Sequence, residues 1–218
     1  MKVGIDGTLI GSWTPVGNEK HILDIGTGCG LISLMLAQRS NSDIIGIDID
    51  GDAISQATEN IKNSPWSDRI KVQEISLQQF AETTLQLFDL IVSNPPFFIN
   101  STKTPTESRT TARHTDTLTH EELIENAIKL LNPEGRICII LPVNEGLQCL
   151  DFAQKKGLYC TNEVTVFPKP NGVAKRMLLE FSLLPAPKVT KKLVIESEVR
   201  HQYSLEFAEL AKDFYLKL

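Results

Sequence analysis

The sequence lacks several features that would place it in other classes. Among its 218 residues no apolar run approaches the roughly 18 residues that a membrane span needs, and residues 1–20 contain no continuous apolar segment of the signal-peptide type. Its four cysteines form no Cys-x-x-Cys pair, so neither a zinc site nor a dithiol redox site is indicated. We therefore expect a cytoplasmic protein with buried thiols, no metal, no membrane association and no obligate protein partner.

The composition excludes a disordered or fibrous chain, because 41% hydrophobic and 22% charged residues are close to the globular average. The length suits one ample domain, and we expect a single domain over residues 1–218. The net charge of −5 disfavours a general nucleic-acid binder. Basic residues nevertheless gather in two segments, with three Lys or Arg against one Glu in residues 100–114 and six against one in residues 165–192. These segments indicate a local patch for a polyanion.

Short runs rich in Ile, Val and Leu alternate with longer segments of helical period, which is typical of a parallel sheet wrapped by helices. The predicted strands are residues 21–25, 43–48, 70–75, 88–93, 136–141, 163–167 and 177–183, and helices are predicted near residues 31–39, 52–63 and 145–156. Asp50 is expected to cap the second of these helices. The sequence thus predicts an α/β, Rossmann-like fold with a mostly parallel seven-stranded sheet that ends in an antiparallel hairpin.

Residues 100–119 break this rhythm, because they contain eight threonines and two serines and no usable apolar period. We expect a long exposed loop. Loops of this length inside a compact domain are usually functional or disordered.

The first predicted strand leads into an Asp-x-Gly-x-Gly-x-Gly turn over residues 24–30, which opens a helix. Glycines allow a tight turn and a close approach of the backbone to a ligand near the helix N-terminus. Asp48, at the end of the second strand, stands 18 residues beyond Gly30, a spacing that suits a carboxylate gripping ribose hydroxyls. A purely structural turn beside a solvated acid is the plainer alternative.

A nicotinamide-dinucleotide turn would need a glycine where this chain has Leu31. Without a pyrophosphate to hold, the favoured ligand is a nucleoside with a short zwitterionic tail, which is S-adenosylmethionine. The turn resembles motif I of the class I methyltransferases.

The resemblance to that motif implies roles for particular residues. Asp24 would order the turn and the amino-acid end of the cofactor, which Gly26 and Gly28 would line, and Asp48 with its neighbour Ile49 would hold the ribose. The family usually has an acid after the third strand to meet the adenine amino group. This chain departs from that pattern with Ser76, a weaker acceptor, as the candidate.

The fourth predicted strand ends in Asn94, Pro95, Pro96 and Phe97. Prolines cannot donate to a sheet, and each residue before a proline is pushed into extended geometry, so a stiff turn is expected at the carboxyl end of this strand. Ligands bind at that edge of a doubly wound sheet. A simple proline turn is the alternative.

Such a turn suits methylation of an exocyclic amine, whose lone pair is delocalised into the ring of the base. The side-chain oxygen of Asn94 and the carbonyl of Pro95 would each accept one amino hydrogen, drawing the nitrogen toward tetrahedral geometry. Phe97 would stack on the base, worth about 1 to 3 kcal/mol. Catalysis is then mostly positioning, and no strong general base is needed.

Further segments carry a resemblance over the whole chain. They are Lys-Val-Gly-Ile-Asp-Gly-Thr-Leu-Ile-Gly-Ser-Trp at residues 2–13, Ala-Arg-His-Thr-Asp at 112–116, Lys-Arg-Met-Leu-Leu-Glu-Phe at 175–181 and Asp-Phe-Tyr-Leu at 213–216. With the two motifs above, they resemble the bacterial tRNA1(Val) adenine-37 N6-methyltransferases. Members normally carry an aromatic and basic segment before the Lys-Val-Gly stretch. Its absence here suggests a truncated start, which puts RNA affinity in question.

A tRNA substrate implies basic residues that contact phosphates while an adenine is splayed out of the anticodon loop. The candidates are Lys103, Arg109, Arg113 and His114 in the threonine-rich segment, and Lys169, Lys175 and Arg176 at the late hairpin. Each of these residues alone could equally be a solvated surface charge.

The resemblance implies an S-adenosylmethionine-dependent transfer of a methyl group to N6 of an adenine in tRNA, adenine 37 of a valine tRNA. Similar tetrapeptides occur in enzymes that methylate guanine N2 of ribosomal RNA or, with tyrosine last, glutamine amides of release factors. Those two activities remain alternatives, as does a non-catalytic RNA- or nucleotide-binding module.

Overall fold

A computed structural model of the protein describes residues 4–96, 118–199 and 202–215. In these ranges the helices are α1 (Ile5–Trp13), α2 (Leu31–Arg39), α3 (Gly51–Lys62), α4 (Leu77–Thr83), α5 (His120–Leu130), α6 (Val143–Lys155) and α7 (Leu205–Ala211). The strands are β1 (His21–Ile25), β2 (Asp43–Asp48), β3 (Ile70–Glu74), β4 (Phe88–Ser93), β5 (Leu131–Pro142), β6 (Tyr159–Phe167), β7 (Arg176–Ser182) and β8 (Val189–Val194).

The strands form one sheet in the order β3-β2-β1-β4-β5-β7-β6-β8. Strands β1 to β5 pair parallel, and β7 runs antiparallel to both β5 and β6. The Rossmann-like α/β fold and its late antiparallel pair are thereby confirmed. The strand order reverses between β1 and β4, and in such sheets this is the point where ligands bind, outside the carboxyl ends of the strands.

The sheet has one strand more than the seven predicted, because β8 pairs parallel with β6 at the outer edge. Only Leu193 of this strand is buried, and Lys191 and Lys192 interrupt any apolar pattern. An edge strand that is mostly exposed leaves little hydrophobic period to read in the sequence.

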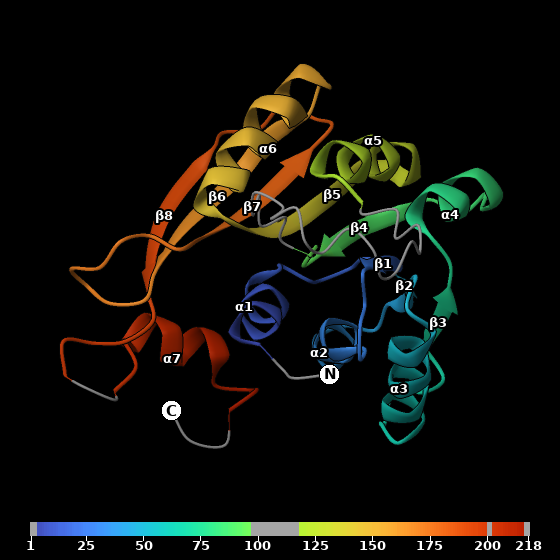
Figure 1. The fold of residues 1–218 in the computed structure, drawn as a ribbon, viewed down its shortest axis with the longest axis horizontal. Coiled ribbons are helices and arrows are strands. Elements are labelled where there is room, and N and C mark those ends of the chain that lie inside the picture. Colours follow the sequence, from blue (N-terminus) through green and yellow to red (C-terminus); the bar gives the residue numbers. More distant parts are fainter. Residues whose placement is uncertain (1–3, 97–117, 200–201, 216–218) are drawn as a thin grey trace, which may run out of the picture.

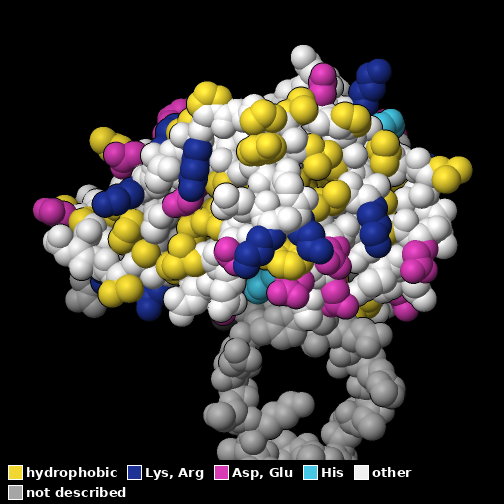
Figure 2. Space-filling model, turned by 90° about the horizontal axis from the view of Figure 1, so that it is seen from above, with side chains coloured by type: hydrophobic (Ala, Val, Ile, Leu, Met, Phe, Trp, Pro, Cys, Tyr) yellow, Lys and Arg dark blue, Asp and Glu magenta, His cyan; other side chains and the backbone are white. Residues whose placement is uncertain are grey.

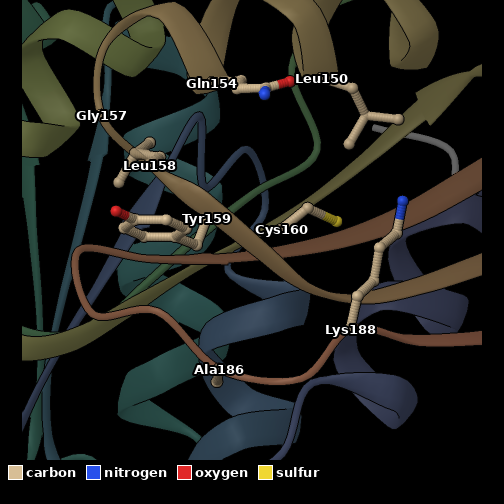
Figure 3. Close-up of a pocket in the computed structure, with 8 residues that line it drawn as sticks. All are labelled: Leu150, Gln154, Gly157, Leu158, Tyr159, Cys160, Ala186 and Lys188. Atoms are coloured by element: carbon tan, nitrogen blue, oxygen red, sulfur yellow. The ribbon is translucent and has the colours of Figure 1, made fainter.

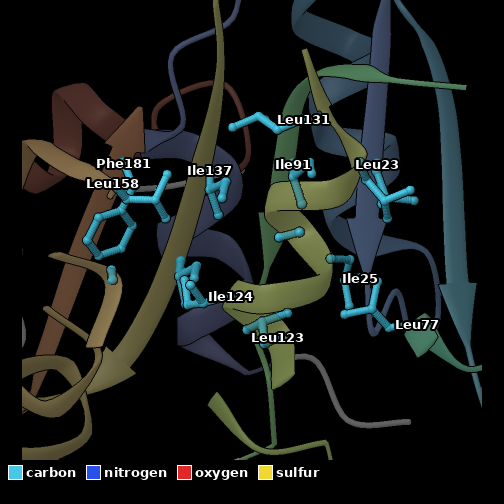
Figure 4. Packing of buried hydrophobic residues seen from close by; sticks show 14 of the residues in the cluster. Leu23, Ile25, Leu77, Ile91, Leu123, Ile124, Leu131, Ile137, Leu158 and Phe181 are labelled. Atoms are coloured by element: carbon cyan, nitrogen blue, oxygen red, sulfur yellow. The ribbon is translucent and has the colours of Figure 1, made fainter. Parts of the chain in front are cut away.

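Helices cover both faces of the sheet (Figure 1). Helices α4, α5 and α6 lie over one face, where Leu77, Leu123 and Cys149 join a core with side chains of β1, β4, β5 and β7 (Figure 4). Helices α1, α2, α3 and α7 lie over the other, where a second core contains residues such as Ile32 and Phe207. These two cores pack on opposite faces of the sheet and hold its strands in place. The predicted site residues stand at the carboxyl edge of those strands.

Strand β5 begins at Leu131, earlier than the predicted residue 136. Its register against β4 shifts, since Phe88 pairs with Leu131 while Leu90 pairs with Arg136. A Cβ on Gly135 would lie 2.8 Å from the carbonyl oxygen of Phe88, so only glycine allows this close approach. The turn-like residues at 132–135 therefore form an irregular strand rather than a loop.

Helix α1 was not predicted, because two glycines and a mixed composition hide its period. These glycines let it pack closely on α2: a Cβ on Gly7 would lie 3.0 Å from Leu31 Cδ2, and one on Gly11 would lie 2.6 Å from Met35 Sδ. Asp6, in the first turn of α1, pairs with Arg176 at the start of β7. Helix α1 thus ties the start of α2 to the far half of the sheet.

Figure 2 looks onto the layer formed by α4, α5 and α6 and shows hydrophobic side chains spread over it, with Lys and Arg interspersed among Asp and Glu. The described residues of this face form no single basic patch. No helix in the described ranges combines the length and apolar character that crossing a bilayer requires.

Candidate functional site

The glycine turn connects β1 to α2 at the carboxyl edge of the sheet. Gly26, Gly28 and Gly30 all have positive φ angles, 71°, 56° and 81°, which side chains other than glycine rarely adopt. The amides of Gly26 and Thr27 donate to the carbonyl of Ile47 on β2, at 2.9 and 3.0 Å. The backbone thus turns sharply over the end of β2 and presents its glycines at the strand-order reversal.

Asp24 lies inside this turn and is fully buried. Its Oδ2 accepts hydrogen bonds from the hydroxyls of Thr27 and Ser33, each at 2.7 Å, and from the Ser33 amide at 3.1 Å. Its Oδ1 is enclosed and has no hydrogen-bond partner among the described residues. One oxygen therefore organises the turn, while the other is left for a donor.

Burial raises the pKa of the Asp24 carboxyl to about 6, against the lowering effect of the Ser33 and Thr27 hydrogen bonds. The nearby Asp48 carboxylate raises this pKa further. A cationic group placed against Oδ1 would counter both effects.

Asp48 ends β2 and reaches the same turn. Its Oδ2 accepts from the Gly28 amide at 2.9 Å and its Oδ1 accepts from the Asp50 amide at 3.0 Å. The next residue, Ile49, is 55% exposed. The Asp48 carboxylate and the Ile49 side chain are thus neighbours at the carboxyl end of β2.

Asp50 and Ser76 serve as helix caps. Asp50 Oδ1 accepts from the amides of Asp52 and Ala53 at the start of α3, as the sequence predicted. Ser76 Oγ accepts from the Gln79 amide at 3.2 Å and caps α4. This bond leaves the second lone pair of the hydroxyl available, and the contact of Ser76 with a cofactor adenine stays a prediction.

The Asn-Pro-Pro segment follows β4 directly, at the strand next to β1. The last register pair of β1 and β4 joins Ile25 to Ser93. Asn94 therefore follows β4 at the same level of the sheet at which the glycine turn follows β1. Its Oδ1 is enclosed and has no hydrogen-bond partner in the ranges described. Pro95 is buried and Pro96 is exposed, while Phe97 lies outside the described residues.

Three of the predicted RNA-binding residues lie at the same sheet edge. Arg176 begins β7 opposite Pro142, the last residue of β5, and its Nε donates to Asp6 Oδ2 at 2.9 Å. Lys175 is exposed beside it, and the 66% exposed side chain of Lys169 stands 3.7 Å from Glu196. Lys103, Arg109, Arg113 and His114 lie outside the described residues.

A pocket lined by α6, the start of β6 and the connection between β7 and β8 lies elsewhere (Figure 3). Tyr159 and Cys160 line it, and Tyr159 pairs with Ser182, which pairs in turn with Arg136 near the start of β5. The pocket therefore opens toward the amino edge of the sheet. Its residues belong to a different place from the glycine turn.

Three residues that organise the turn were missed by sequence reasoning. Thr27 and Ser33 hold Asp24, and Gly46 on β2 packs against Thr27, because a Cβ there would lie 2.8 Å from Thr27 Oγ1. Ser33 stands nine residues after Asp24. No local spacing rule pointed to it, whereas a glycine inside a strand does mark a close approach.

Comparison with solved structures gives the same fold. A predicted O-methyltransferase, protein Atu636 from Agrobacterium tumefaciens, superimposes with a TM-score of 0.75 at 18% identity, covering 95% of each chain. TrmN from Thermus thermophilus has a TM-score of 0.56 at 19% identity, covering 76% of this chain and 44% of that one. At these identities the similarity concerns the architecture alone.

Sequence comparison is more specific. The model of the family "Methyltransferase small domain" matches residues 8–156. The tRNA1(Val) (adenine(37)-N6)-methyltransferase of Parabacteroides distasonis is 48% identical, covering 100% of this chain and 92% of its relative. The enzyme of the same name from Erwinia tasmaniensis is 40% identical, covering 99% and 89%. The chain therefore belongs to the tRNA1(Val) (adenine(37)-N6)-methyltransferase family.

Proposed function

We propose that the protein transfers a methyl group from S-adenosylmethionine to N6 of an adenine in tRNA, adenine 37 of a valine tRNA. One observation carries this proposal: Asp24 Oδ1 and Asn94 Oδ1 are enclosed acceptor oxygens without hydrogen-bond partners among the described residues, and they stand at the ends of the adjacent strands β1 and β4. Buried acceptors normally have a hydrogen-bond donor, so we expect a ligand to supply a donor to each oxygen. The names of the relatives supply the substrate.

The residues at the turn fit the cofactor. Asp24 Oδ1 would accept from its ammonium group, and Asp48 would accept from the ribose hydroxyls beside Ile49. Gly26, where a Cβ would meet nothing within 4 Å, leaves room for the cofactor chain. When bound, S-adenosylmethionine supplies an electrophilic methyl group on a sulfonium. The residues of the glycine turn would hold the cofactor so that this methyl group faces the end of β4.

The end of β4 would hold the base. Asn94 Oδ1 and the carbonyl of Pro95 would each accept one hydrogen of the adenine amino group, with Phe97 stacking on the ring. The two prolines limit backbone freedom, so these acceptors are placed before the substrate arrives. Such preorganised positioning accounts for most of the rate enhancement that the reaction needs.

Cofactor affinity should depend on pH through Asp24. Because its pKa is raised to about 6, the carboxylate is present above that pH and is protonated below it. A protonated carboxyl loses its attraction for ammonium. At about one pH unit below the pKa only about a tenth of the molecules are ionised, so the Kd for S-adenosylmethionine should rise about 10-fold.

Calorimetry at about pH 5 and about pH 8 would measure this dependence, with Asp24→Asn as the comparison. The Asp24→Asn variant should bind S-adenosylmethionine weakly, and its Kd should change little between the two pH values. A wild-type Kd that stays level, or an equally steep change in Asp24→Asn, would exclude Asp24 as the ammonium partner.

The RNA should lie along the carboxyl edge of the sheet. Lys169, Lys175 and Arg176 stand at this edge, and so does the Asn-Pro-Pro segment that follows β4. The ion pair of Arg176 with Asp6 gives that residue a structural task as well, which leaves Lys175 as the clearer phosphate candidate among the three. A tRNA substrate would place the enzyme in the cytoplasm.

Lys175→Ala should weaken tRNA binding and reduce the slope of log Kd against log salt concentration by about 1, the value of one phosphate contact. Filter binding over a series of salt concentrations measures that slope. Lys62→Ala, which removes an exposed lysine at the end of α3, is the matched control and should leave the slope unchanged. An identical slope in both variants would take Lys175 out of the RNA surface.

Transfer of labelled methyl groups to purified acceptors tests the proposed function. Valine tRNA should accept methyl groups, whereas ribosomal RNA and release factor should not. Labelling of either of the latter instead would favour guanine N2 or glutamine methylation. Cofactor binding without labelling of any acceptor would favour a non-catalytic module.

A further inference from the structure

The last residue of β4, Ser93, makes a side-chain hydrogen bond to β1 across the strand-order reversal. Its side chain is 1% exposed, and its hydroxyl donates to the carbonyl of Ile25 at 2.9 Å. Ile25 is the last residue of β1 and directly precedes the glycine turn, while Ser93 directly precedes Asn94. The bond therefore joins the two strands at the points where both functional turns depart.

The bond stands where the backbone ladder of the two strands ends. In a parallel ladder each carbonyl accepts from an amide of the neighbouring strand, and the ladder of β1 and β4 ends at the Ile25 and Ser93 pair. Asn94 is the last residue with an amide hydrogen before Pro95 and Pro96, which cannot continue the ladder. The Ser93 hydroxyl adds a side-chain donor to the Ile25 carbonyl at this end of the ladder.

The glycine turn is held to β2 through Ile47 and Asp48, as the Gly26 and Gly28 amides show. Ser93 adds a bond to the opposite neighbour, β4. The cofactor side and the base side of the reaction are thereby joined by one buried side-chain bond in addition to the backbone ladder of β1 and β4. A misplacement of about 1 Å between reacting groups can cost about 100-fold in rate.

We propose that Ser93 is a positioning residue for methyl transfer, which sets the Asn94 turn against the glycine turn through the Ile25 carbonyl. This inference rests on the proposed function. Ser93 touches neither substrate nor cofactor in this account, so its loss should affect turnover and spare binding.

The test is Ser93→Ala, which removes the hydroxyl and little volume. Turnover of valine tRNA should fall about 10-fold in kcat, while KM for tRNA and the calorimetric Kd for S-adenosylhomocysteine stay within about 2-fold of wild type. Ser42→Ala is the matched control. Ser42 is also fully buried, and its hydroxyl donates to a backbone carbonyl, that of Glu19, at the amino edge of the sheet.

Both variants lose one buried hydroxyl bond, so thermal melting should register similar losses of stability. A fall in kcat confined to Ser93→Ala supports the positioning role. Equal kcat in the two variants, or a rise in the Kd for S-adenosylhomocysteine that accounts for the loss, would overturn it. A wild-type enzyme that methylates no tRNA would instead reject the proposed function on which the inference stands.

Discussion

Replacing Asn94 by alanine is expected to lower kcat for tRNA methylation about 1000-fold while leaving the Kd for S-adenosylmethionine within about 2-fold of wild type. Removing one preorganised hydrogen-bonding group from a catalytic site typically costs about 100- to 1000-fold in kcat. The upper end is expected here because Asn94 Oδ1 is enclosed and unpartnered among the described residues, so water cannot readily replace it. Single-turnover kinetics with saturating cofactor would measure the effect.

Asn162→Ala is the control for this variant. Asn162 on β6 is also half-buried, and its Oδ1 is likewise enclosed without a partner in the described ranges. It lies two strands beyond β5, away from the glycine turn. This control should turn over at close to the wild-type rate. Comparable rates in Asn94→Ala and wild type would reject the proposed role of the turn.

The second large effect concerns Asp48. Changing it to alanine should raise the Kd for S-adenosylmethionine by at least about 100-fold, because two hydrogen bonds from the ribose to a charged acceptor are lost and each such bond is worth about 1.5 to 3 kcal/mol. The same change removes the acceptor that holds the Gly28 amide at 2.9 Å. Once cofactor is saturating, kcat should recover to within about 3-fold of wild type.

Asp50→Ala serves as the control for Asp48→Ala, two residues away with the same chemical change. It removes the cap of α3 and should reduce the free energy of unfolding by about 1 kcal/mol without weakening cofactor binding more than about 3-fold. Calorimetric titration of both variants makes the comparison. An Asp48→Ala enzyme that binds cofactor as tightly as Asp50→Ala would remove the ribose contact from the account.

The strands around the site could be predicted because each is a short buried run with clear ends. Residues 21–25, 43–48 and 88–93 were predicted with the bounds that the structure has. The glycines and the prolines mark where these strands stop, and the parallel topology brings those stops to one edge. Position along the chain was therefore enough to bring Asp24, Asp48 and Asn94 together.

The supporting contacts could not be predicted from the sequence. Ser33 meets Asp24 from the first turn of α2, and Ser93 meets Ile25 from the neighbouring strand, 68 residues away. A single serine belongs to no periodic pattern that would indicate its hydrogen-bond partner. Both bonds also depend on the direction of side chains in the folded protein, which the sequence does not give. Strand β8 was missed for a related reason, since its exposed lysines hide the alternation that identifies a strand.

Mapping of the methylated nucleoside shows whether the Asn94 turn presents adenine 37 to the cofactor. Valine tRNA would be incubated with S-adenosylmethionine and either the wild-type protein or Asn94→Ala, then digested to fragments and analysed by mass spectrometry. N6-methyladenosine is expected at position 37 with the wild-type protein, and none above background with the variant. N2-methylguanosine, a methyl group at another position, or equal amounts of product from both proteins would contradict it.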